Sequence, residues 1–413
     1  MDTIHKLFLQ AIATAIRGES VHWNQEISQE EWDVLLHMAA DHQVLPLVFE
    51  AVYACPAFSS AGKDLTGPVR LSVQRQVIEQ ASRTIRFLKL YSSLKKAGAD
   101  PLVVKGIVCR ELYPVPDQRP SGDEDVLIPP SDYALCKEVF LRNGLVVADE
   151  QAEAENSFEI PFRKPGSSLH IELHKSLFPP ESEAYGNLNS FFENVHSRAA
   201  TVSVMGVPIR TLHPTDHLFY LICHAFKHFL YSGFGIRQVC DIMLFANAYG
   251  AEIQWDLVLE NCRAIRADRF AAALFRIGEQ YLSFDQNKSC ITAQWQQIHV
   301  DPEPLLADLL SAGTYGKSSN GRLHSSTITL DAVAAQNHGR KKRGLTAALF
   351  PSADSLKGRY PYLKDHPWLL PAVWVSRILR YSVRQRSNDS DVSESLRIGN
   401  QRIDLMKEYG ILD

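Results

Sequence analysis

Five short apolar runs of the kind that form β-strands lie between residues 98 and 212, and the sequence on both sides of this region has helical spacing. Short strands that gather in one stretch between helical patterns favour an α+β protein over an all-helical or an all-β one. The longest helical pattern, from Pro68 to Lys96, contains no further glycine or proline before Gly98. We therefore predict a mixed sheet with helices, flanked by helical regions.

The 413 residues are enough for two or three domains that each bury a core. We predict an N-terminal helical domain over residues 1–97 and an α/β domain over residues 98–212. A helical domain over residues 213–330 is expected to line a cleft, and residues 331–413 form a basic C-terminal segment. A stretch rich in Gly and Ser after residue 312 is typical of a loop or linker before this segment.

The charges of the whole chain nearly balance, with 43 Lys and Arg against 47 Asp and Glu, which excludes a globally basic nucleic-acid coat. Residues 337–386 nevertheless contain eleven Lys or Arg and only two Asp. Such a cluster is most often a solvated face. Aromatic residues among its charges leave an anionic acceptor, a membrane surface or, less favoured, nucleic acid as alternative partners.

The seven cysteines are scattered and form no Cys-x-x-Cys pair, so neither a zinc ribbon nor a disulfide framework is indicated. The N-terminus has an acid at position 2 and the pattern of an amphipathic helix, which differs from a signal peptide. The apolar run over residues 367–375 is far shorter than the ~20 residues that a membrane span needs. We expect a cytoplasmic protein without a transmembrane segment.

The strongest local signal for chemistry is Gly122-Asp123-Glu124-Asp125, which opens the apolar run over residues 126–128. Side chains two apart on a strand point to the same face, so Asp123 and Asp125 project together while Glu124 points away. Two neighbouring carboxylates repel each other unless a cation lies between them, and Mg²⁺ binds carboxylate and phosphate oxygens. The pattern indicates a magnesium site, against the alternative of a strand that begins with solvated acids.

A second polar face occurs in the strand pattern His170-Ile-Glu172-Leu-His174. Alternation places His170, Glu172 and His174 on one side of the strand. A carboxylate between imidazoles suits a third metal ligand or a general base, and an ordinary exposed sheet face is the alternative. Because carboxylates that share a metal repel one another without it, we expect Asp125→Asn to leave the fold intact or to stabilise it.

A third cluster lies on two predicted helices and comprises His224, Lys227, His228, Arg237 and Asp241. In the favoured interpretation, Lys227, His228 and Arg237 line a cleft and hold a triphosphate or another part of the substrate. In a second one, His224, His228 and Asp241 bind a metal, as in helical metal-dependent phosphohydrolases. The third interpretation is a polar contact between helices that includes an Arg237–Asp241 pair, since residues four apart share a helix face.

The order of these motifs resembles the uncharacterised nucleotidyltransferase family of bacteria, within the polymerase-β-like nucleotidyltransferase superfamily. The motifs are Lys105-Gly106, Leu112-Tyr-Pro114, Arg119-Pro120, Asp123-x-Asp125 and Ile171-Glu172-Leu-His174, within a resemblance that spans roughly residues 20–385. The resemblance implies that Asp123 and Asp125 bind two Mg²⁺ ions and that Glu172 is the third carboxylate.

The same resemblance implies that the Lys105-Gly106 turn lies beside the triphosphate, and Gly122 is assigned to this nucleotide site. The superfamily has Gly-Ser at the turn, so Lys105 is expected to replace the serine's phosphate contact with a point charge. The expected activity is Mg²⁺-dependent transfer of a nucleoside monophosphate from a triphosphate such as ATP to a hydroxyl of an unknown small molecule or protein.

In this activity Asp123, Asp125 and Glu172 are the expected catalytic residues, and Glu172 helps to deprotonate the acceptor hydroxyl. Two alternatives differ in class. One is a nucleotide-binding or regulatory protein that keeps the fold without catalysis, which the presence of all three acids argues against. The other is the phosphohydrolase that would use the helix histidines.

Overall fold

A computed structural model describes residues 1–149, 157–180, 182, 184–231, 233–312, 329–330, 332–333, 336, 366–374 and 390–413. The chain divides into two compact units. The first unit comprises Met1–Ser182, Gly186–Phe226 and Phe234–Thr314, and the second comprises Glu183–Tyr185, Lys227–Gly233 and Tyr315–Asp413. The basic surface predicted for residues 337–386 lies outside the described residues, apart from residues 366–374.

The centre of the first unit is a five-stranded mixed sheet in the order β1-β2-β5-β4-β3. In this order, the strands are Leu102–Val104, Glu124–Leu127, His170–His174, Glu159–Arg163 and Val146–Val147. Strands β2 and β5 are parallel, and the other neighbours are antiparallel. All five strand predictions and the α+β class are confirmed.

Alternation along the two central strands separates a core face from a polar face. Val126 of β2 and Ile171 and Leu173 of β5 are fully buried in the hydrophobic core. Asp125 and Glu172 point to the opposite side, because neighbouring residues of a strand face opposite ways. The apolar residues that fix the register therefore also fix the side on which the carboxylates lie.

A second, two-stranded sheet was not predicted. Strands β6 (Ala200–Val204) and β7 (Val207–Thr211) form an antiparallel hairpin. Met205 and Gly206 both have positive φ at its turn. Two-residue hairpin turns need such backbone angles, and Asn-Gly or Asp-Gly is their usual sequence signal. Met205-Gly206 lacks that signal, so the sequence pattern did not reveal the hairpin.

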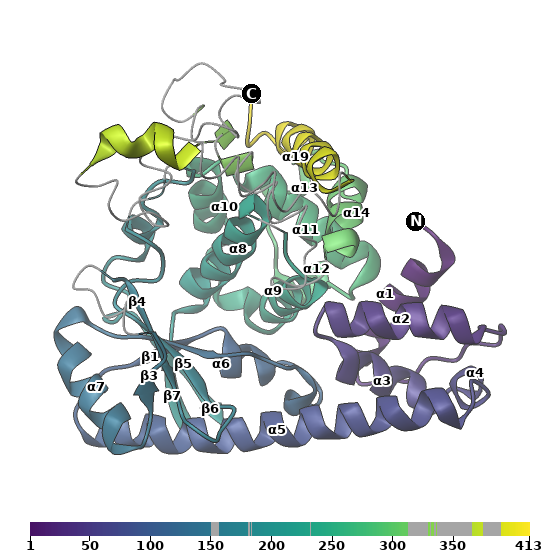
Figure 1. Ribbon diagram of the computed structural model, residues 1–413, viewed down its shortest axis with the longest axis horizontal. Helices are drawn as coiled ribbons and strands as arrows, with labels where there is room; N and C mark the ends of the chain where they lie inside the picture. The colour runs from purple at the N-terminus through teal and green to yellow at the C-terminus, as the bar shows by residue number, and fades with distance from the viewer. Residues whose placement is uncertain are drawn as a thin grey trace. The chain divides into compact units, whose positions relative to one another are not determined.

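The N-terminal helices are α1 (Thr3–Ala15), α2 (Gln29–Asp41), α3 (Leu45–Tyr53), α4 (Pro56–Ser59) and α5 (Lys63–Lys96). The predicted capping box of α2 is present, because Ser28 and Glu31 exchange side-chain and backbone hydrogen bonds. Helix α5 has 34 residues and contacts both α3 and α7, so it runs along the N-terminal helices and the sheet region (Figure 1).

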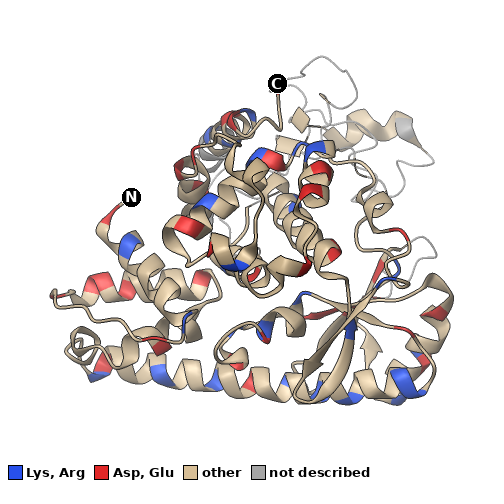
Figure 2. Cartoon of the chain, turned by 180° about the vertical axis from the view of Figure 1, so that it is seen from behind, with Lys and Arg blue, Asp and Glu red and all other residues tan. Residues whose placement is uncertain are grey.

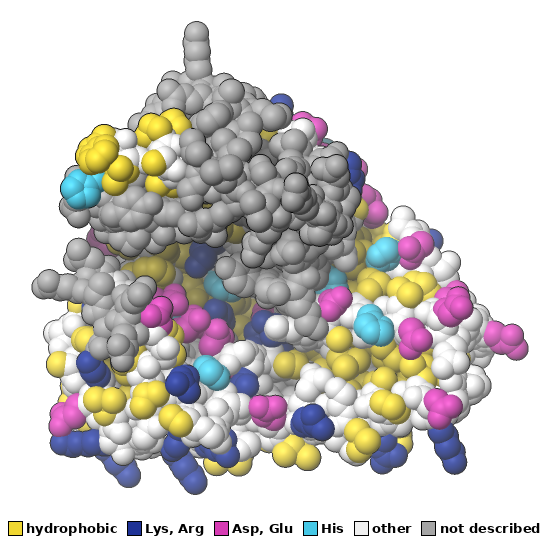
Figure 3. All heavy atoms as spheres, in the orientation of Figure 1, with side chains coloured by type: hydrophobic (Ala, Val, Ile, Leu, Met, Phe, Trp, Pro, Cys, Tyr) yellow, Lys and Arg dark blue, Asp and Glu magenta, His cyan; other side chains and the backbone are white. Residues whose placement is uncertain are grey.

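The outer face of α5 combines apolar and basic side chains. Leu71, Ile78 and Ile85 are 67%, 69% and 46% exposed, at intervals of seven residues. Figure 2 shows Lys and Arg along the same helix, and in Figure 3 the edge that it forms alternates yellow apolar and dark blue basic side chains.

The remaining helices follow β1 in the chain. They are α6 (Gly106–Arg110), α7 (Tyr133–Arg142), α8 (Pro214–Tyr231), α9 (Ile236–Tyr249), α10 (Trp255–Ala264), α11 (Asp268–Tyr281), α12 (Gln286–Ser289), α13 (Ala293–Gln296), α14 (Glu303–Ala312) and α19 (Ser390–Glu408). Short 3₁₀ helices are η1 (Pro116–Gln118), η2 (Pro130–Asp132), η4 (Leu188–Phe192), η5 (Gly250–Glu252) and η7 (Pro367–Leu369). No helix in the described parts of the chain has the length and apolar character that crossing a membrane requires.

Candidate active site

The acidic side chains of β2 and β5 meet because the two strands are parallel and in register. Asp125 pairs with Glu172, so their side chains lie next to each other on the polar face of the sheet. One ligand atom from each of Asp125, Glu172 and His174 lies within 4.8 Å of the other two. These three residues, called the carboxylate centre below, include two of the three predicted metal ligands. His170 is exposed at the start of β5 and is not part of the centre.

His174 lies next to both carboxylates of the centre. Its Nε2 is 3.2 Å from Oδ1 of Asp125 and 3.7 Å from Oε2 of Glu172. Burial alone would lower the pKa of the His174 imidazole, but its hydrogen bonds to Asp125 and Glu172 raise that pKa to about 9. At neutral pH the ring is therefore a cation that holds the two carboxylates together. The sequence placed His174 on this face but did not indicate this role.

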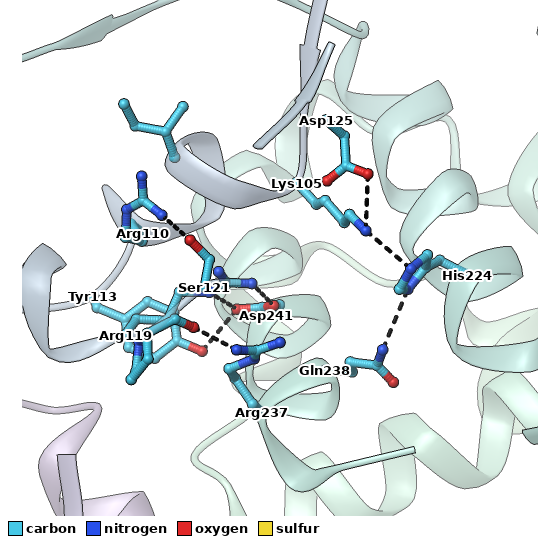
Figure 4. A network of polar contacts seen from close by, with 12 residues as sticks. Lys105, Arg110, Tyr113, Arg119, Ser121, Asp125, His224, Arg237, Gln238 and Asp241 are labelled. Carbon is cyan, nitrogen blue, oxygen red and sulfur yellow. Dashed lines mark hydrogen bonds and ion pairs between the residues drawn. The ribbon is translucent and has the colours of Figure 1, made fainter. Parts of the chain in front are cut away.

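Lys105 reaches the carboxylate centre from the turn between β1 and α6. Its Nζ is 3.0 Å from Oδ1 of Asp125 and 3.1 Å from Nε2 of His224 on α8 (Figure 4). Burial opposes the charged form, but the Asp125 carboxylate outweighs this effect and holds the pKa of Lys105 well above its ordinary range. Lys105 is therefore an ammonium ion bound to a predicted metal ligand.

Asp125 has one occupied and one open oxygen. Oδ1 contacts both Lys105 and His174, whereas the buried Oδ2 has no hydrogen-bond partner. Burial would raise the pKa of Asp125, but Lys105 and His174 lower it below its ordinary value, so the carboxylate is ionised. An ionised, buried oxygen without a donor fits a bound cation, since unpaired buried charges are costly. The residues present thus suit a metal ion with oxygen ligands.

Glu172 has a proton affinity that differs strongly from that of Asp125. Burial and the nearby charges of Asp125 and Asp123 raise the pKa of Glu172 to about 7, although His174 and Lys105 act in the opposite direction. A carboxylate that titrates near neutral pH can both accept and release a proton under working conditions. Two carboxylates with such different affinities are typical of a site that divides roles between acid–base chemistry and charge stabilisation.

Asp123 lies in the wall of a pocket next to the centre. This pocket, called the cationic pocket below, is lined by Lys105, Gly106, Arg119, Ser121, Asp123, Leu221, His224, Arg237, Gln238 and Asp241. Asp123 is half-buried and does not belong to the three-residue group described above, although its charge contributes to the raised pKa of Glu172. Gly122, predicted at the nucleotide site, is exposed just before it.

Glu124 points to the opposite side of β2, as predicted, and supports the Lys105-Gly106 turn from behind. Its Oε2 accepts a hydrogen bond of 2.8 Å from the backbone N–H of Ile107, and its Oε1 contacts the buried guanidinium of Arg110 at 2.5 Å. Gly106 has a φ of +38°, and a Cβ at this position would lie 2.3 Å from Oε2 of Glu124. Glycine is therefore required where the turn approaches the carboxylate.

Asp241 belongs to a buried pair that the sequence did not predict. Its carboxylate accepts hydrogen bonds from Arg119 and, at 2.8 Å, from the hydroxyl of Tyr113 (Figure 4). The interpretation with an Arg237–Asp241 pair is therefore wrong. The phosphohydrolase interpretation finds no support either, because Asp241 is bound to Arg119 and, among the described residues, His224, His228 and Asp241 do not form a group that could hold a metal ion.

Arg237 is a half-buried cation in the cationic pocket. It donates to the backbone carbonyl oxygen of Pro120, and its buried Nε has no hydrogen-bond partner. Burial and the neighbouring charge of Arg119 lower the pKa of Arg237 to about 10, so the guanidinium remains charged at neutral pH. A cation with a buried, unsatisfied donor favours an anionic ligand.

Lys227 and His228, the other predicted members of this cluster, lie on the part of α8 that belongs to the second unit. Both side chains are half-buried. Their part in nucleotide binding stays a prediction.

A mixed sheet with ionised carboxylates on one face, next to a pocket that contains Lys and Arg, has the residues of an enzyme that transfers phosphorus-containing groups. Residues 28–283 match the family described as uncharacterised nucleotidyltransferase, and the chain belongs to this family. The protein is therefore a nucleotidyltransferase that acts on a nucleotide. No curated protein and no solved structure matches the chain.

Proposed function

We propose that the protein transfers a nucleoside monophosphate from a nucleoside triphosphate to a hydroxyl group, in a reaction that depends on Mg²⁺. The acceptor oxygen attacks the α-phosphorus, and the bond from this phosphorus to the β-phosphate oxygen breaks, so that pyrophosphate leaves. The observation that carries the proposal is the open, ionised Oδ2 of Asp125 beside Glu172, next to a pocket with the half-buried guanidinium of Arg237.

The proposed metal ligands are Asp125, Glu172 and Asp123. Carboxylate oxygens are the protein ligands that Mg²⁺ prefers. The buried Oδ2 of Asp125 has no hydrogen-bond partner, so it is the oxygen that a bound cation would stabilise most. Bound Mg²⁺ would neutralise charge on the phosphate oxygens as the bond to pyrophosphate breaks. Asp123 lines the cationic pocket, from which it would face the triphosphate of a bound nucleotide.

The proposed triphosphate site is the cationic pocket, with Arg237 as its main cation. Arg237 differs from Arg119 in its partners. Within the described residues, Arg237 donates to a backbone carbonyl oxygen and keeps an unsatisfied Nε, whereas Arg119 is bound to the carboxylate of Asp241. Gly106 lines the same pocket, so we retain its backbone as a proposed contact of the triphosphate. We also retain Lys227 and His228 as proposed nucleotide-binding residues.

Glu172 is the proposed base for the acceptor hydroxyl. Its pKa of about 7 means that a substantial fraction is ionised at neutral pH and that the ionised form accepts a proton more readily than an ordinary carboxylate does. Asp125 is unsuited to this role, because Lys105 and His174 keep it ionised and occupy one of its oxygens.

The experiment that tests the proposal is an incubation of the full chain with Mg²⁺ and nucleoside triphosphates labelled at the α-phosphate. Candidate acceptors include small hydroxyl compounds, proteins and the chain itself. We expect the α-label in a product, release of pyrophosphate and no transfer of a γ-label. Asp125→Asn should abolish the transfer. Nucleotide binding without any transfer would support the regulatory alternative and reject the proposal.

A nucleotide titration at constant Mg²⁺ tests the cationic pocket separately. Arg237→Ala should weaken binding by about 1–3 kcal/mol, the cost of losing one charged hydrogen bond. Lys227→Ala tests the corresponding prediction for α8. The control is Arg163→Ala, because Arg163 is an exposed arginine at the end of β4 and lines no part of the pocket. Unchanged affinity in Arg237→Ala would remove the pocket from the nucleotide site.

A further inference from the structure

The occupation of Asp125 limits the number of metal ions that the carboxylate centre can bind. A carboxylate that bridges two ions offers one oxygen to each. Oδ1 of Asp125 already receives two donors, at 3.0 Å from Nζ of Lys105 and 3.2 Å from Nε2 of His174. Each carboxylate oxygen has two lone pairs, so these donors saturate Oδ1 and leave only Oδ2 open.

We infer that the carboxylate centre takes one metal ion and that the ammonium of Lys105 occupies the place of a second cation beside Asp125. This inference rests on the proposed function and specifies its metal requirement. It differs from the two ions that the family resemblance implies. The difference follows from Lys105, whose ammonium contacts Oδ1 of Asp125.

Hydrogen bonds through His217 of α8 and Thr211 of β7 fix the backbone of Lys105. Its N–H donates to Nε2 of His217 at 3.0 Å. Burial lowers the pKa of His217 to about 3, so this ring is neutral and its nitrogen accepts the bond. Nδ1 of His217 lies 3.2 Å from the hydroxyl of Thr211, and this hydroxyl donates to the carbonyl oxygen of Val103 on β1. The turn is thereby tied to β1 and β7.

The ammonium group of Lys105 is fixed as well, because Oδ1 of Asp125 and Nε2 of His224 both accept hydrogen bonds from it. An ammonium is only a donor, so Nε2 of His224 accepts and Nδ1 of the same ring carries the proton. The amide nitrogen Nε2 of Gln238 lies 3.3 Å from this Nδ1, so the amide has to turn by 180° to accept that proton. With its oxygen turned toward the ring, the amide accepts the Nδ1 proton and also satisfies Oε1, a buried atom that otherwise lacks a partner.

The local charges give the same result. The ammonium of Lys105 lies next to the carboxylates Asp123, Asp125 and Glu172. Three carboxylates carry at most three negative charges, so Lys105 and one divalent cation together balance them. A second ion on Asp125 would have to displace Lys105 or lie against it, and like charges at such short range repel strongly in a buried site.

Counting bound Mn²⁺ ions tests the inference directly, because Mn²⁺ accepts the same oxygen ligands as Mg²⁺ and is detected by electron paramagnetic resonance. The full chain is titrated with Mn²⁺ without nucleotide, so that ions held by phosphates do not contribute. We expect one ion per chain in the unaltered protein. Lys105→Met should admit a second ion with a spin-coupled signal, whereas Lys89→Met, on the exposed side of α5, should leave the count at one.

Two ions in the unaltered protein would overturn the inference, and so would a folded Lys105→Met variant that still binds one. The first measurement needs no variant and decides the matter even if Lys105→Met fails to fold. The proposed function is judged separately by transfer of the α-label. Transfer with two bound ions rejects the inference alone, whereas no bound ion and no transfer rejects both.

Discussion

At the scale of single residues, Asp125 stabilises the fold as well as the proposed reaction. The sequence led us to expect that Asp125→Asn would not destabilise the protein, because carboxylates that share a metal repel one another. The contacts in the structure argue for the opposite expectation, since Lys105 and His174 are both bonded to this carboxylate and would lose their counter-charge. Repulsion from Glu172 is weaker because the raised pKa of Glu172 leaves it partly neutral.

We therefore predict that Asp125→Asn lowers the free energy of unfolding by on the order of 3 kcal/mol, as expected for removal of one charge from a buried pair. Denaturant unfolding at neutral pH measures it, with Asp33→Asn on the exposed side of α2 as the control that should change nothing. Because the pKa of Asp125 is lowered, its contribution is present above the unfolded-state pKa and is lost as the pH falls through the folded-state value. Equal stability of both variants would contradict the assignment.

Gly106 tests the contact between the turn and Glu124. Gly106→Ala adds a methyl group 2.3 Å from Oε2 of Glu124 and also strains a positive φ. Gly98→Ala has a positive φ but open space around the new methyl group, so it separates the two effects. We expect about 1 kcal/mol of destabilisation in Gly98→Ala and at least about 2 kcal/mol in Gly106→Ala. Only Gly106→Ala should also weaken nucleotide binding; similar losses in both variants would show that the Glu124 contact is unimportant.

At the scale of elements, strand β5 makes the stability of the protein dependent on pH. The pKa of Glu172 is raised from 4.5 to about 7, so between these values the folded state holds a proton that the unfolded state has released. Stability from this group is therefore complete below pH 4.5 and declines as the pH rises through about 7. His174, raised from 6.5 to about 9, contributes stability below pH 6.5 that is lost as the pH rises through about 9.

We predict that Glu172→Gln flattens the decline in unfolding free energy between pH 5 and pH 7, because glutamine cannot release the proton. The measurement is denaturant unfolding of both proteins at several pH values without divalent cations. The control is Glu138→Gln, an exposed carboxylate on α7, which should retain the decline. A decline of the same size in Glu172→Gln would place the titrating group elsewhere.

The elements that the sequence predicted well are those with a repeated pattern. Apolar residues at helical spacing between Gly235 and Gly250 predict a helix from about Ile236 to Tyr249, and α9 has these bounds. The start of α5 was predicted five residues late, since Pro68 lies inside the helix. Thr215 is a residue type that often caps a helix, but α8 already begins at Pro214, and the Thr215 hydroxyl accepts a bond from the backbone of Gln254.

The candidate site was predictable only where one strand or helix carries the pattern. Spacing in the sequence placed Asp123 and Asp125 together, and Glu172 with His174. It could not predict that Asp125 and Glu172 are neighbours, which depends on the order of strands in the sheet. The bond between Arg119 and Asp241 joins residues 122 positions apart, and no local period contains that information.

At the scale of the whole molecule, the described site lies within the first unit, although three distant parts of the chain build it. The turn and β2 come from residues 102–127, β5 from residues 170–174, and α8 and α9 supply His224 and Arg237. Such a site forms only when contacts of long sequence separation have formed. Binding of the proposed metal ion and nucleotide should therefore occur only after this unit has folded completely.

Helix α5 fixes the angular positions, around its axis, of the two groups of elements that pack on it. An α-helix turns by about 100° and advances by about 1.5 Å with each residue. A residue inserted between the segments of α5 that contact α3 and α7 would swing one set of partners around the helix axis relative to the other. Its solvent face, with Leu71 and Ile78, can vary without this effect. The number of residues in α5 is thus constrained more tightly than the identity of its exposed residues.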